Sequence, residues 1–333
     1  MITRIAVTNA NDETWVLPLS DPLDSGFIVR DISGLGPVKS NINLSENAGI
    51  SGSSFNSART PARNIVLTLD FLENVVYVPD PMYPLNTVVG IEGARLKTYQ
   101  FFPTESRVRF DIETEAGTFY IYGYIESNAP TIFSKSTGTV ISIICPDPYF
   151  LKVGAGTVSK EIGDIAKYFY FLSNATPSNP PLIPREPLYD GKFAMGEAFF
   201  QTIQFNIPYT GTVNVGPTLI LAARGGVVEN PRIVFSSEDD PDINNMMSFD
   251  FAGAQLANML DGEYLEIVCE PQNKSVILHK PLTGDAVNYL GALNIDSVWP
   301  VLKPGRNLFS YDAKSGGTAI RFRYSYDLKF TGV

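Results

Sequence analysis

The stretch Ile141–Phe150, ISIICPDPYF, decides how this chain divides. A run rich in β-branched residues, typical of a strand, ends abruptly in Cys145-Pro146-Asp147-Pro148. Each proline fixes its own φ and biases the residue before it toward extended geometry, so the strand should close into a stiff exit. Two aromatic residues follow at once and are expected to pack. We predict a domain boundary here, with Pro146, Pro148 and Tyr149 as the domain hinge, stiff enough to keep the two domains at a fixed angle. The alternative is a strand end with a simple proline turn.

Upstream of this exit, the pattern predicts antiparallel strands. Residues 107–113 alternate charged and apolar side chains, residues 115–117 form a turn, and residues 118–127 return as the second strand of a hairpin. The returning strand has large side chains on both faces, because three tyrosines alternate with apolar residues: Tyr120, Tyr122 and Tyr124. The tyrosine face therefore needs cover, from another subunit or from a helix of the same chain.

One segment departs from the β pattern. Residues Asn86–Gln100 carry apolar side chains at rough helical spacing, with Asn86 as a candidate N-cap and Phe101-Phe102-Pro103 as the end. We predict an N-terminal domain, residues 1–150, of antiparallel β structure with one helix.

The second half, residues 151–333, contains many short strand patterns separated by turn signals. A hairpin is expected over 264–269 and 275–279, and a final strand over 320–326. Such a set predicts a C-terminal β-sandwich in a mainly β protein. Residues 173–187 contain five prolines and predict an extended loop, facing either solvent or a partner.

Composition excludes several classes of function. The net charge of −10 argues against binding nucleic acid by phosphate neutralisation, whereas an acidic channel wall would let DNA pass without retaining it. Two distant cysteines and one histidine give no zinc or iron–sulfur framework, and buried free thiols are expected. The N-terminus lacks the apolar core of a signal peptide, and no stretch approaches the ~20 apolar residues of a membrane span. We expect a protein that stays in the cytoplasm until it is assembled.

Few residues suggest chemistry. His279 has no nucleophile motif near it and is interpreted as a surface or interfacial residue. The acidic run 236–245 offers oxygen ligands for calcium but lacks the pattern of an EF-hand loop, and is interpreted as a solvated loop. Trp299 could stack on a sugar, but core packing is preferred because an apolar strand pattern surrounds it. We predict no catalytic residue, no metal ligand and no cofactor, although 35 acidic residues leave a hydrolytic carboxylate pair as an open alternative.

Four segments, in order along the chain, carry a family pattern: FIVRDISGLGP at 27–37, YIYGYIES at 120–127, IFSKS at 132–136 and WPVLKPGRNLF at 299–309. Together they resemble the distal tail protein family of bacteriophages, the baseplate hub known as Dit. The resemblance extends over 27–150 and, more loosely, over 203–330.

The resemblance implies a structural protein and not an enzyme. In that family the N-terminal domain forms a hexameric ring around the tail channel, and a galectin-like or carbohydrate-module-like sandwich points outward. The implied partners are the tail tube protein, a tail-tip hub protein resembling a tail-associated lysin, and receptor-binding or other peripheral baseplate proteins. The implied location is the virion tail tip or baseplate, with assembly in the host cytoplasm and DNA passing through the lumen without specific binding.

The same resemblance gives candidate residues for the ring interface. The turn at 34–37 is expected from its composition, and the family pattern implies that loops such as 45–60 join neighbouring subunits. The alternative for 45–60 is a plain surface loop. The candidates are Gly34, Gly36, Pro37, Phe55, Tyr120, Tyr122 and Tyr124. The alternative function is a carbohydrate-binding β-sandwich module for host recognition.

Overall fold

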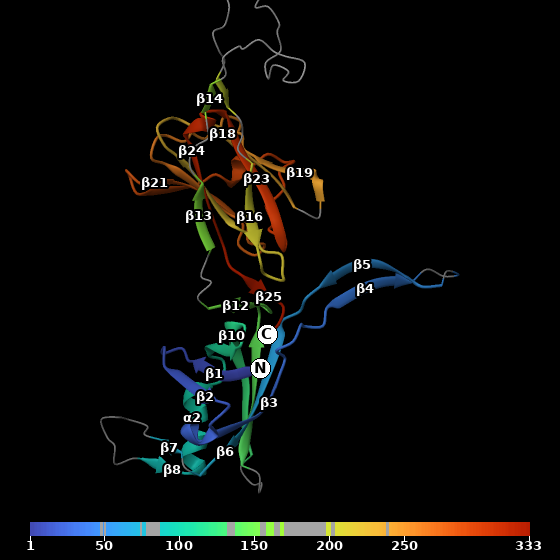
Figure 1. Cartoon of the computed structure of the whole chain (residues 1–333), viewed down its shortest axis with the longest axis vertical. Coiled ribbons are helices and arrows are strands. Elements are labelled where there is room, and N and C mark those ends of the chain that lie inside the picture. The colour runs from blue at the N-terminus through green and yellow to red at the C-terminus, as the bar shows by residue number, and fades with distance from the viewer. Residues whose placement is uncertain are drawn as a thin grey trace, which may run out of the picture. The chain divides into compact units, whose positions relative to one another are not determined.

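The computed structural model describes residues 1–46, 49, 51–73, 75–77, 87–131, 137–153, 158–162, 167–169, 198–200, 204–237 and 240–333 (Figure 1). The chain forms two compact units. The first unit contains Met1–Gly156, Gly211–Val213 and Asp327–Val333, and the second contains Thr157–Thr210 and Asn214–Tyr326. The expected mainly β fold is confirmed, because strands dominate both units.

The first unit is built around one large antiparallel sheet with the strand order β2-β1-β9-β10-β11-β6-β3, and β12 and β25 pair beside β10. The strands of the first unit are β1 (Ile2–Thr8), β2 (Thr14–Pro18), β3 (Phe27–Ser33), β4 (Asn41–Glu46), β5 (Ser53–Arg59), β6 (Arg63–Phe71), β7 (Val76–Tyr77), β8 (Val88–Val89), β9 (Arg107–Thr114), β10 (Gly117–Pro130), β11 (Gly138–Cys145), β12 (Phe150–Lys152) and β25 (Lys329–Phe330). Of these, β4 pairs with β5 and β7 with β8 in two small sheets of their own. Its helices are α1 (Pro22–Ser25) and α2 (Ile91–Phe101). The hairpin predicted from residues 107–127 is therefore confirmed as β9 and β10.

Alternation along the strands sends one set of side chains into a core on one face of this sheet. Phe119, Ile121 and Ile125 of β10 are buried there together with Ala94 and Phe102, from α2 and its C-cap. The helix therefore packs on the face opposite the tyrosines. The alternative in which it covers Tyr120, Tyr122 and Tyr124 is wrong.

The helix itself begins later than predicted. Its N-cap is Gly90, whose φ of 82° lies in the left-handed region, and the preceding Val88–Val89 pairs with Val76–Tyr77 as a short ladder. Glycine adopts this backbone conformation at little cost, so the chain can turn sharply from strand into helix. The predicted cap, Asn86, lies outside the described residues. No helix in the described part of the chain is long and apolar enough to cross a membrane.

The second unit contains two facing sheets, one of six strands (β13-β24-β17-β20-β21-β22) and one of four (β16-β23-β18-β19), besides the pair β14-β15. Its strands are β13 (Val158–Ile162), β14 (Lys167–Phe169), β15 (Ala198–Phe200), β16 (Phe205–Tyr209), β17 (Thr218–Ala223), β18 (Glu229–Ser237), β19 (Asp240–Ser248), β20 (Tyr264–Val268), β21 (Ser275–Lys280), β22 (Asp285–Asn288), β23 (Gly305–Ser315) and β24 (Ile320–Tyr326). Short 3₁₀ turns follow at η2 (Leu290–Ala292) and η3 (Gly317–Ala319). The hairpin predicted over 264–279 is confirmed as β20 and β21.

Aromatic side chains join the two sheets of this sandwich. Tyr311 of β23 stacks on Phe322 of β24 with ring centroids 5.3 Å apart, and Phe205 of β16 lies 5.0 Å from the same Phe322 ring. Contacts of this kind add to the energy of burial itself. The β-sandwich prediction is therefore confirmed, while the galectin-like assignment stays a prediction. The proline-rich stretch 173–187 lies outside the described residues.

The division of the chain differs from the predicted ranges 1–150 and 151–333. Strand β11 does end at Cys145, as the prolines predict, but the chain then adds β12 to the first unit and enters the second unit only after Gly156. The residues predicted as a hinge, Pro146, Pro148 and Tyr149, therefore lie inside the first unit. Asp327–Val333 returns to that unit because β25 pairs with β12, a ladder without a local sequence signal.

Each unit contains one buried free thiol, Cys145 in the first and Cys269 in the second. Burial raises the pKa of the Cys145 thiol to about 12 and raises the pKa of Cys269 as well. An unfolded cysteine loses its proton near pH ~8.5, so above that pH the folded state holds more protons than the unfolded state.

Stability should therefore fall as the pH rises from about 9 toward 12. We expect denaturant unfolding midpoints to decrease between about pH 8 and about pH 10. A Cys145→Ala, Cys269→Ala double variant should show a smaller decrease, because other titrating groups are common to both proteins. Equal pH slopes in the two proteins would contradict the assignment to the thiols.

Candidate assembly site

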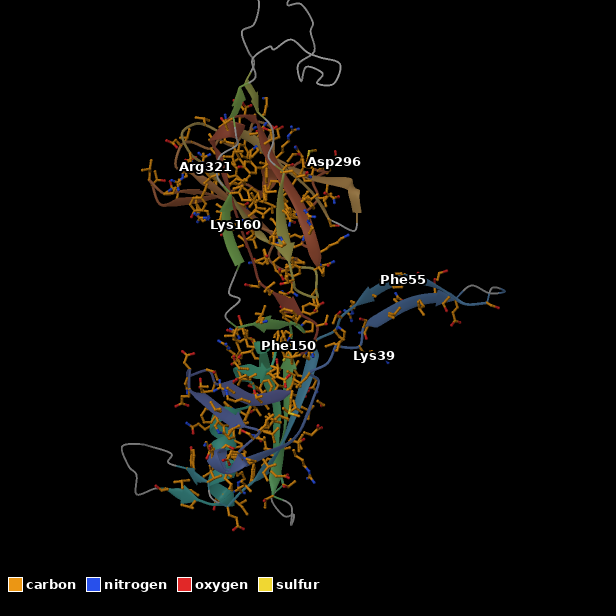
Figure 2. The ribbon with its side chains drawn as sticks, viewed as in Figure 1. Lys39, Phe55, Phe150, Lys160, Asp296 and Arg321 are labelled. Atoms are coloured by element: carbon orange, nitrogen blue, oxygen red, sulfur yellow. The ribbon has the colours of Figure 1, made fainter. Side chains whose placement is uncertain are left out.

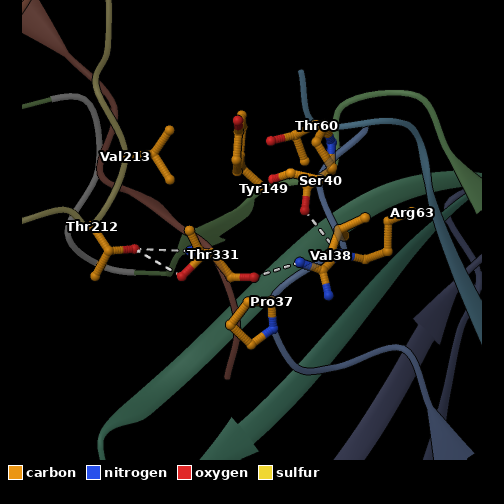
Figure 3. Close-up of a pocket in the computed structure, with 10 residues that line it drawn as sticks. Pro37, Val38, Ser40, Thr60, Arg63, Tyr149, Thr212, Val213 and Thr331 are labelled. Carbon is orange, nitrogen blue, oxygen red and sulfur yellow. Dashed lines mark hydrogen bonds between the residues drawn. The ribbon is translucent and has the colours of Figure 1, made fainter. Parts of the chain in front are cut away.

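A buried arginine organises one end of the first unit. Arg63 is the first residue of β6, its side chain is 1% exposed, and all of its hydrogen-bond partners are backbone carbonyls. Nε donates to Pro148 O at 2.7 Å, and Nη1 donates to Gly34 O and, at 2.7 Å, to Gly36 O. Nη2 donates to Thr331 O at 2.5 Å (Figure 3). One side chain thus joins three distant segments of the chain.

The surroundings of Arg63 explain how a cation is tolerated inside the protein. Burial lowers the pKa of the guanidinium, but arginine stays charged in proteins. Four carbonyl dipoles replace the water that burial removes, and the Phe150 ring lies 4.6 Å from the guanidinium carbon. The planar fork of arginine reaches several acceptors at once, which a lysine ammonium does not do in this geometry.

The turn predicted at 34–37 is present as two bends of the chain, at Gly34 and Gly36, and one of these glycines has no substitute. Gly34 has a φ of 84°, and a Cβ added there would lie 2.0 Å from Asn64 O. The turn therefore packs backbone against backbone at the start of β6. At Gly36, by contrast, an added Cβ meets nothing within 4 Å.

The returning C-terminal segment, Asp327–Val333, completes this cluster. Phe330 pairs with Phe150 across the β12–β25 ladder, and its ring lies edge-on to Phe119 at 5.2 Å. Val333 N donates to Leu35 O at 3.2 Å, and Lys329 Nζ lies 3.1 Å from Asp147 Oδ2. The segment therefore contacts both the 34–37 turn and the proline exit.

A cavity of about 230 Å³ lies beside Arg63, wholly within the first unit (Figure 3). Besides Arg63, its walls come from three parts of the chain: Pro37, Val38, Ser40 and Thr60, then Pro148 and Tyr149, and finally Thr212, Val213 and Thr331. Pro37 to Ser40 and Thr60 are the two roots of a hairpin, so the cavity marks where that hairpin leaves the unit.

The hairpin consists of β4 and β5 and projects from the rest of the first unit (Figures 1 and 2). Its apolar side chains have no core to enter: Ile42 is 60% exposed, Leu44 53% and Phe55 66%. Leu44 pairs with Phe55 and Ile42 with Ala58, so these residues form one apolar stripe on one face of the ribbon. The expectation of a loop over 45–60 is wrong for 45–46, which end β4, and for 53–59, where a serine-rich strand without clear alternation pairs with β4.

The tyrosine face of β10 is open to solvent. Tyr122 is 38% exposed and Tyr124 is 47% exposed, and the Tyr120 and Tyr122 rings meet edge to face at 5.7 Å. Arginine guanidinium groups of β9 stack over the tyrosine rings, Arg109 at 4.2 Å from Tyr120 and Arg107 at 4.1 Å from Tyr122. Burial first, and then the neighbouring Tyr122, raise the pKa of the Tyr120 hydroxyl. The result is a rigid surface of aromatic rings with both apolar and hydrogen-bonding capacity.

The remaining residues that the sequence offered as candidates for chemistry do not come together into a site in the described part of the chain. In the second unit, His279 is half-buried, stacks on Tyr264 at 4.6 Å and has its Nε2 2.8 Å from Glu266 Oε2. Trp299 is half-buried, not in the core as expected, and Lys274 Nζ lies 5.2 Å from its ring. The expectation of a solvated loop over the acidic run 236–245 is wrong for most of the run, because β18 extends to Ser237 and β19 begins at Asp240. Glu238 and Asp239 lie outside the described residues. Among the residues that the structure describes, no group of three or more His, Cys, Asp or Glu side chains could hold a metal ion.

The fold is similar to that of a phage tail hub protein. The crystal structure of the SPP1 Dit protein, a paradigm of the hub adsorption apparatus in phages infecting Gram-positive bacteria, matches with a TM-score of 0.55 and 10% identity, covering 97% of this chain and 98% of that chain. Two structures of the phage P2 baseplate, activated with Ca and with Sr, give TM-scores of 0.40 and 0.39 at 11% and 10% identity, with 98% of each chain covered. No family model and no curated protein matches the chain.

At 10% identity the SPP1 Dit similarity concerns the fold. It extends over nearly the whole of both chains, which confirms, at the level of the fold, the resemblance to the distal tail protein family predicted from the sequence. It does not assign the interface residues, so Gly34, Gly36, Pro37, Phe55, Tyr120, Tyr122 and Tyr124 stay predictions as ring contacts.

The two glycines of the 34–37 turn form a matched pair for a test. Gly34→Ala should lower the free energy of unfolding by at least about 2 kcal/mol, because it combines a left-handed φ with a backbone clash. Gly36→Ala should change it by no more than about 0.5 kcal/mol. Denaturant unfolding of both variants measures the difference, and equal effects would show that the turn is not packed as described.

Proposed function

We propose that this protein is the structural hub of a phage tail, or of a machine derived from one. It forms a ring that joins the tail tube to the baseplate or tip. The fold similarity to the SPP1 Dit hub over nearly the full chain supports the class of protein. The observation that carries the proposal is the uncovered apolar stripe of the β4–β5 hairpin.

An isolated two-stranded ribbon is marginally stable in water, and large apolar side chains at its surface are unfavourable. Ile42, Leu44 and Phe55 therefore need a surface outside their own subunit. A second copy of the chain supplies one, because the tyrosine face of β10 is open and is not covered by α2. A projecting patch on one side and a receiving patch elsewhere make a head-to-tail contact, which closes into a ring when the rotation is a whole fraction of a turn.

The family resemblance sets the expected number of subunits at six. The first unit forms the ring, and the second unit holds peripheral or receptor-binding proteins. The tail tube protein and a tail-tip protein bind the two ends of the ring. With a net charge of −10, the channel wall is neutral or acidic and DNA passes without specific binding. The protein holds partners in register and catalyses no reaction.

Phe55→Ser in the full chain tests the hairpin as an interface. The wild type should sediment as a ring-sized oligomer and show a central hole in negative stain. The variant should sediment mainly as a monomer with unchanged thermal unfolding, because Phe55 contributes nothing to the core of its own subunit. Leu282→Ser removes an apolar side chain of the second unit that is even more exposed, and it should leave the ring intact. A ring that survives Phe55→Ser would contradict the proposed interface.

Tyr124→Ser tests the receiving surface in the same way. This residue is exposed in the single subunit, so its loss should not change monomer stability, but it should weaken the ring. If the hairpin docks on the tyrosine face, the effects of Tyr124→Ser and Phe55→Ser on assembly are non-additive. Additive effects would place the two residues in separate contacts. Measurement is by sedimentation over a range of protein concentrations.

A further inference from the structure

The second unit is inserted into the sequence of the first. In each unit, a pair of strands holds the incoming and the outgoing chain together. Inside the first unit, the strand before the insertion pairs with the strand after it, Phe150 with Phe330 and Leu151 with Lys329. Inside the second unit, its first strand pairs with its last, and Val158 lies opposite Tyr326. The entry and the exit of the chain are therefore held together independently in both units.

This arrangement makes closure of the first unit depend on the second. When the second unit is unfolded, Asp327–Val333 is tethered to β12 through a long flexible stretch of chain, and closing such a loop costs chain entropy. When the second unit is folded, the Val158–Tyr326 pair already holds the two ends of that loop together. The effective concentration of the returning segment at β12 then rises.

The returning segment, named here the clasp, reaches the ring-forming part of the first unit. Thr331 O is one of the four carbonyls held by Arg63, which also holds Gly34 O and Gly36 O. Val333 N donates to Leu35 O, and a Cβ added at Gly332 would lie 2.9 Å from that same oxygen. The clasp (Asp327–Val333) therefore packs directly on the turn from which the β4–β5 hairpin departs.

Further contacts hold the clasp along both of its edges. Thr212 N donates to Lys329 O at 2.9 Å and Thr331 N donates to Thr212 Oγ1 at 2.8 Å, while β12 pairs on the other edge. Phe330 packs against the core of the first unit. Loss of the clasp leaves the carbonyls of the turn and the Arg63 guanidinium without part of their shared network, which is unfavourable for buried polar groups.

We propose that the clasp is an assembly checkpoint: the hairpin root becomes fixed for ring formation only when a folded second unit delivers Asp327–Val333 to the first. This inference rests on the proposed ring function. During synthesis the clasp emerges after the whole of the second unit, so truncated chains, or chains with a misfolded second unit, are excluded from the ring.

The two buried thiols report on the units separately in the full-length protein. Cys145 lies opposite Arg63 in the β6–β11 ladder, and Cys269 lies in the second unit. Phe330→Ser should open the clasp locally. We expect at least ten-fold faster labelling of Cys145 by a thiol reagent, unchanged labelling of Cys269, and loss of the ring.

The decisive variant is Leu278→Ala, which weakens the core of the second unit far from the clasp in sequence. If closure of the first unit depends on folding of the second, both Cys145 and Cys269 should be labelled faster, and a smaller share of chains should enter the ring. Faster labelling of Cys269 alone, with the ring preserved, would overturn the checkpoint. Leu282→Ser, an exposed substitution in the second unit, should change none of the three readouts.

The result is separable from the ring proposal itself. If wild-type protein forms no ring, the proposed function fails, while the labelling of Cys145 in Leu278→Ala still decides whether the second unit controls closure of the first. If wild type and Phe330→Ser form rings equally well, the ring proposal stands and the checkpoint is wrong.

Discussion

The buried Arg63 guanidinium is the interaction on which the first unit depends. It satisfies four carbonyls from three segments, the 34–37 turn, the proline exit and the C-terminal segment. A buried charge is costly unless it is fully hydrogen-bonded, so this cluster is stable only when every segment is present. The cooperativity of that end of the molecule follows from the number of segments that one side chain serves.

The order in which the chain passes through the two units explains how distant segments meet at Arg63. Because the strands on either side of the second unit pair with each other, the first unit is discontinuous in sequence but continuous in space. A domain inserted in this way adds little strain when its own ends are adjacent, as the Val158–Tyr326 pair makes them. In the proposed ring, the sequence of the second unit can therefore vary without changing the residues proposed to close the ring.

The surfaces of the first unit divide into those that complete a subunit and those that are left open. The core face of the sheet is filled by α2 and the aromatic residues around Trp15, where the Phe27 ring lies 4.5 Å away. In the described part of the chain, the tyrosine face and the apolar stripe of the hairpin have no such cover. An element whose apolar face is filled only by another molecule gains its stability from assembly, which suits a protein whose proposed role is to hold a fixed geometry.

The sequence by itself determined the features that have local causes. Alternation predicted β9, β10 and the β20–β21 hairpin, the prolines predicted the end of β11 at Cys145, and composition predicted the 34–37 turn. These signals lie within a few residues of the structure that they specify. The ordered segments of the family pattern also predicted the fold shared with the SPP1 Dit protein.

Only the tertiary structure decided the rest of the candidate site. No sequence motif marks Arg63, because its hydrogen-bond acceptors are backbone carbonyls and every residue of the chain has a backbone carbonyl. Which carbonyls it meets depends on the path of segments that lie as far apart as Gly34 and Thr331. The sequence did not predict strand β5, because its serine-rich run shows no clear alternation. It did not predict the return of Asp327–Val333 either, because the pairing of so short a strand depends on its partner and not on its own pattern.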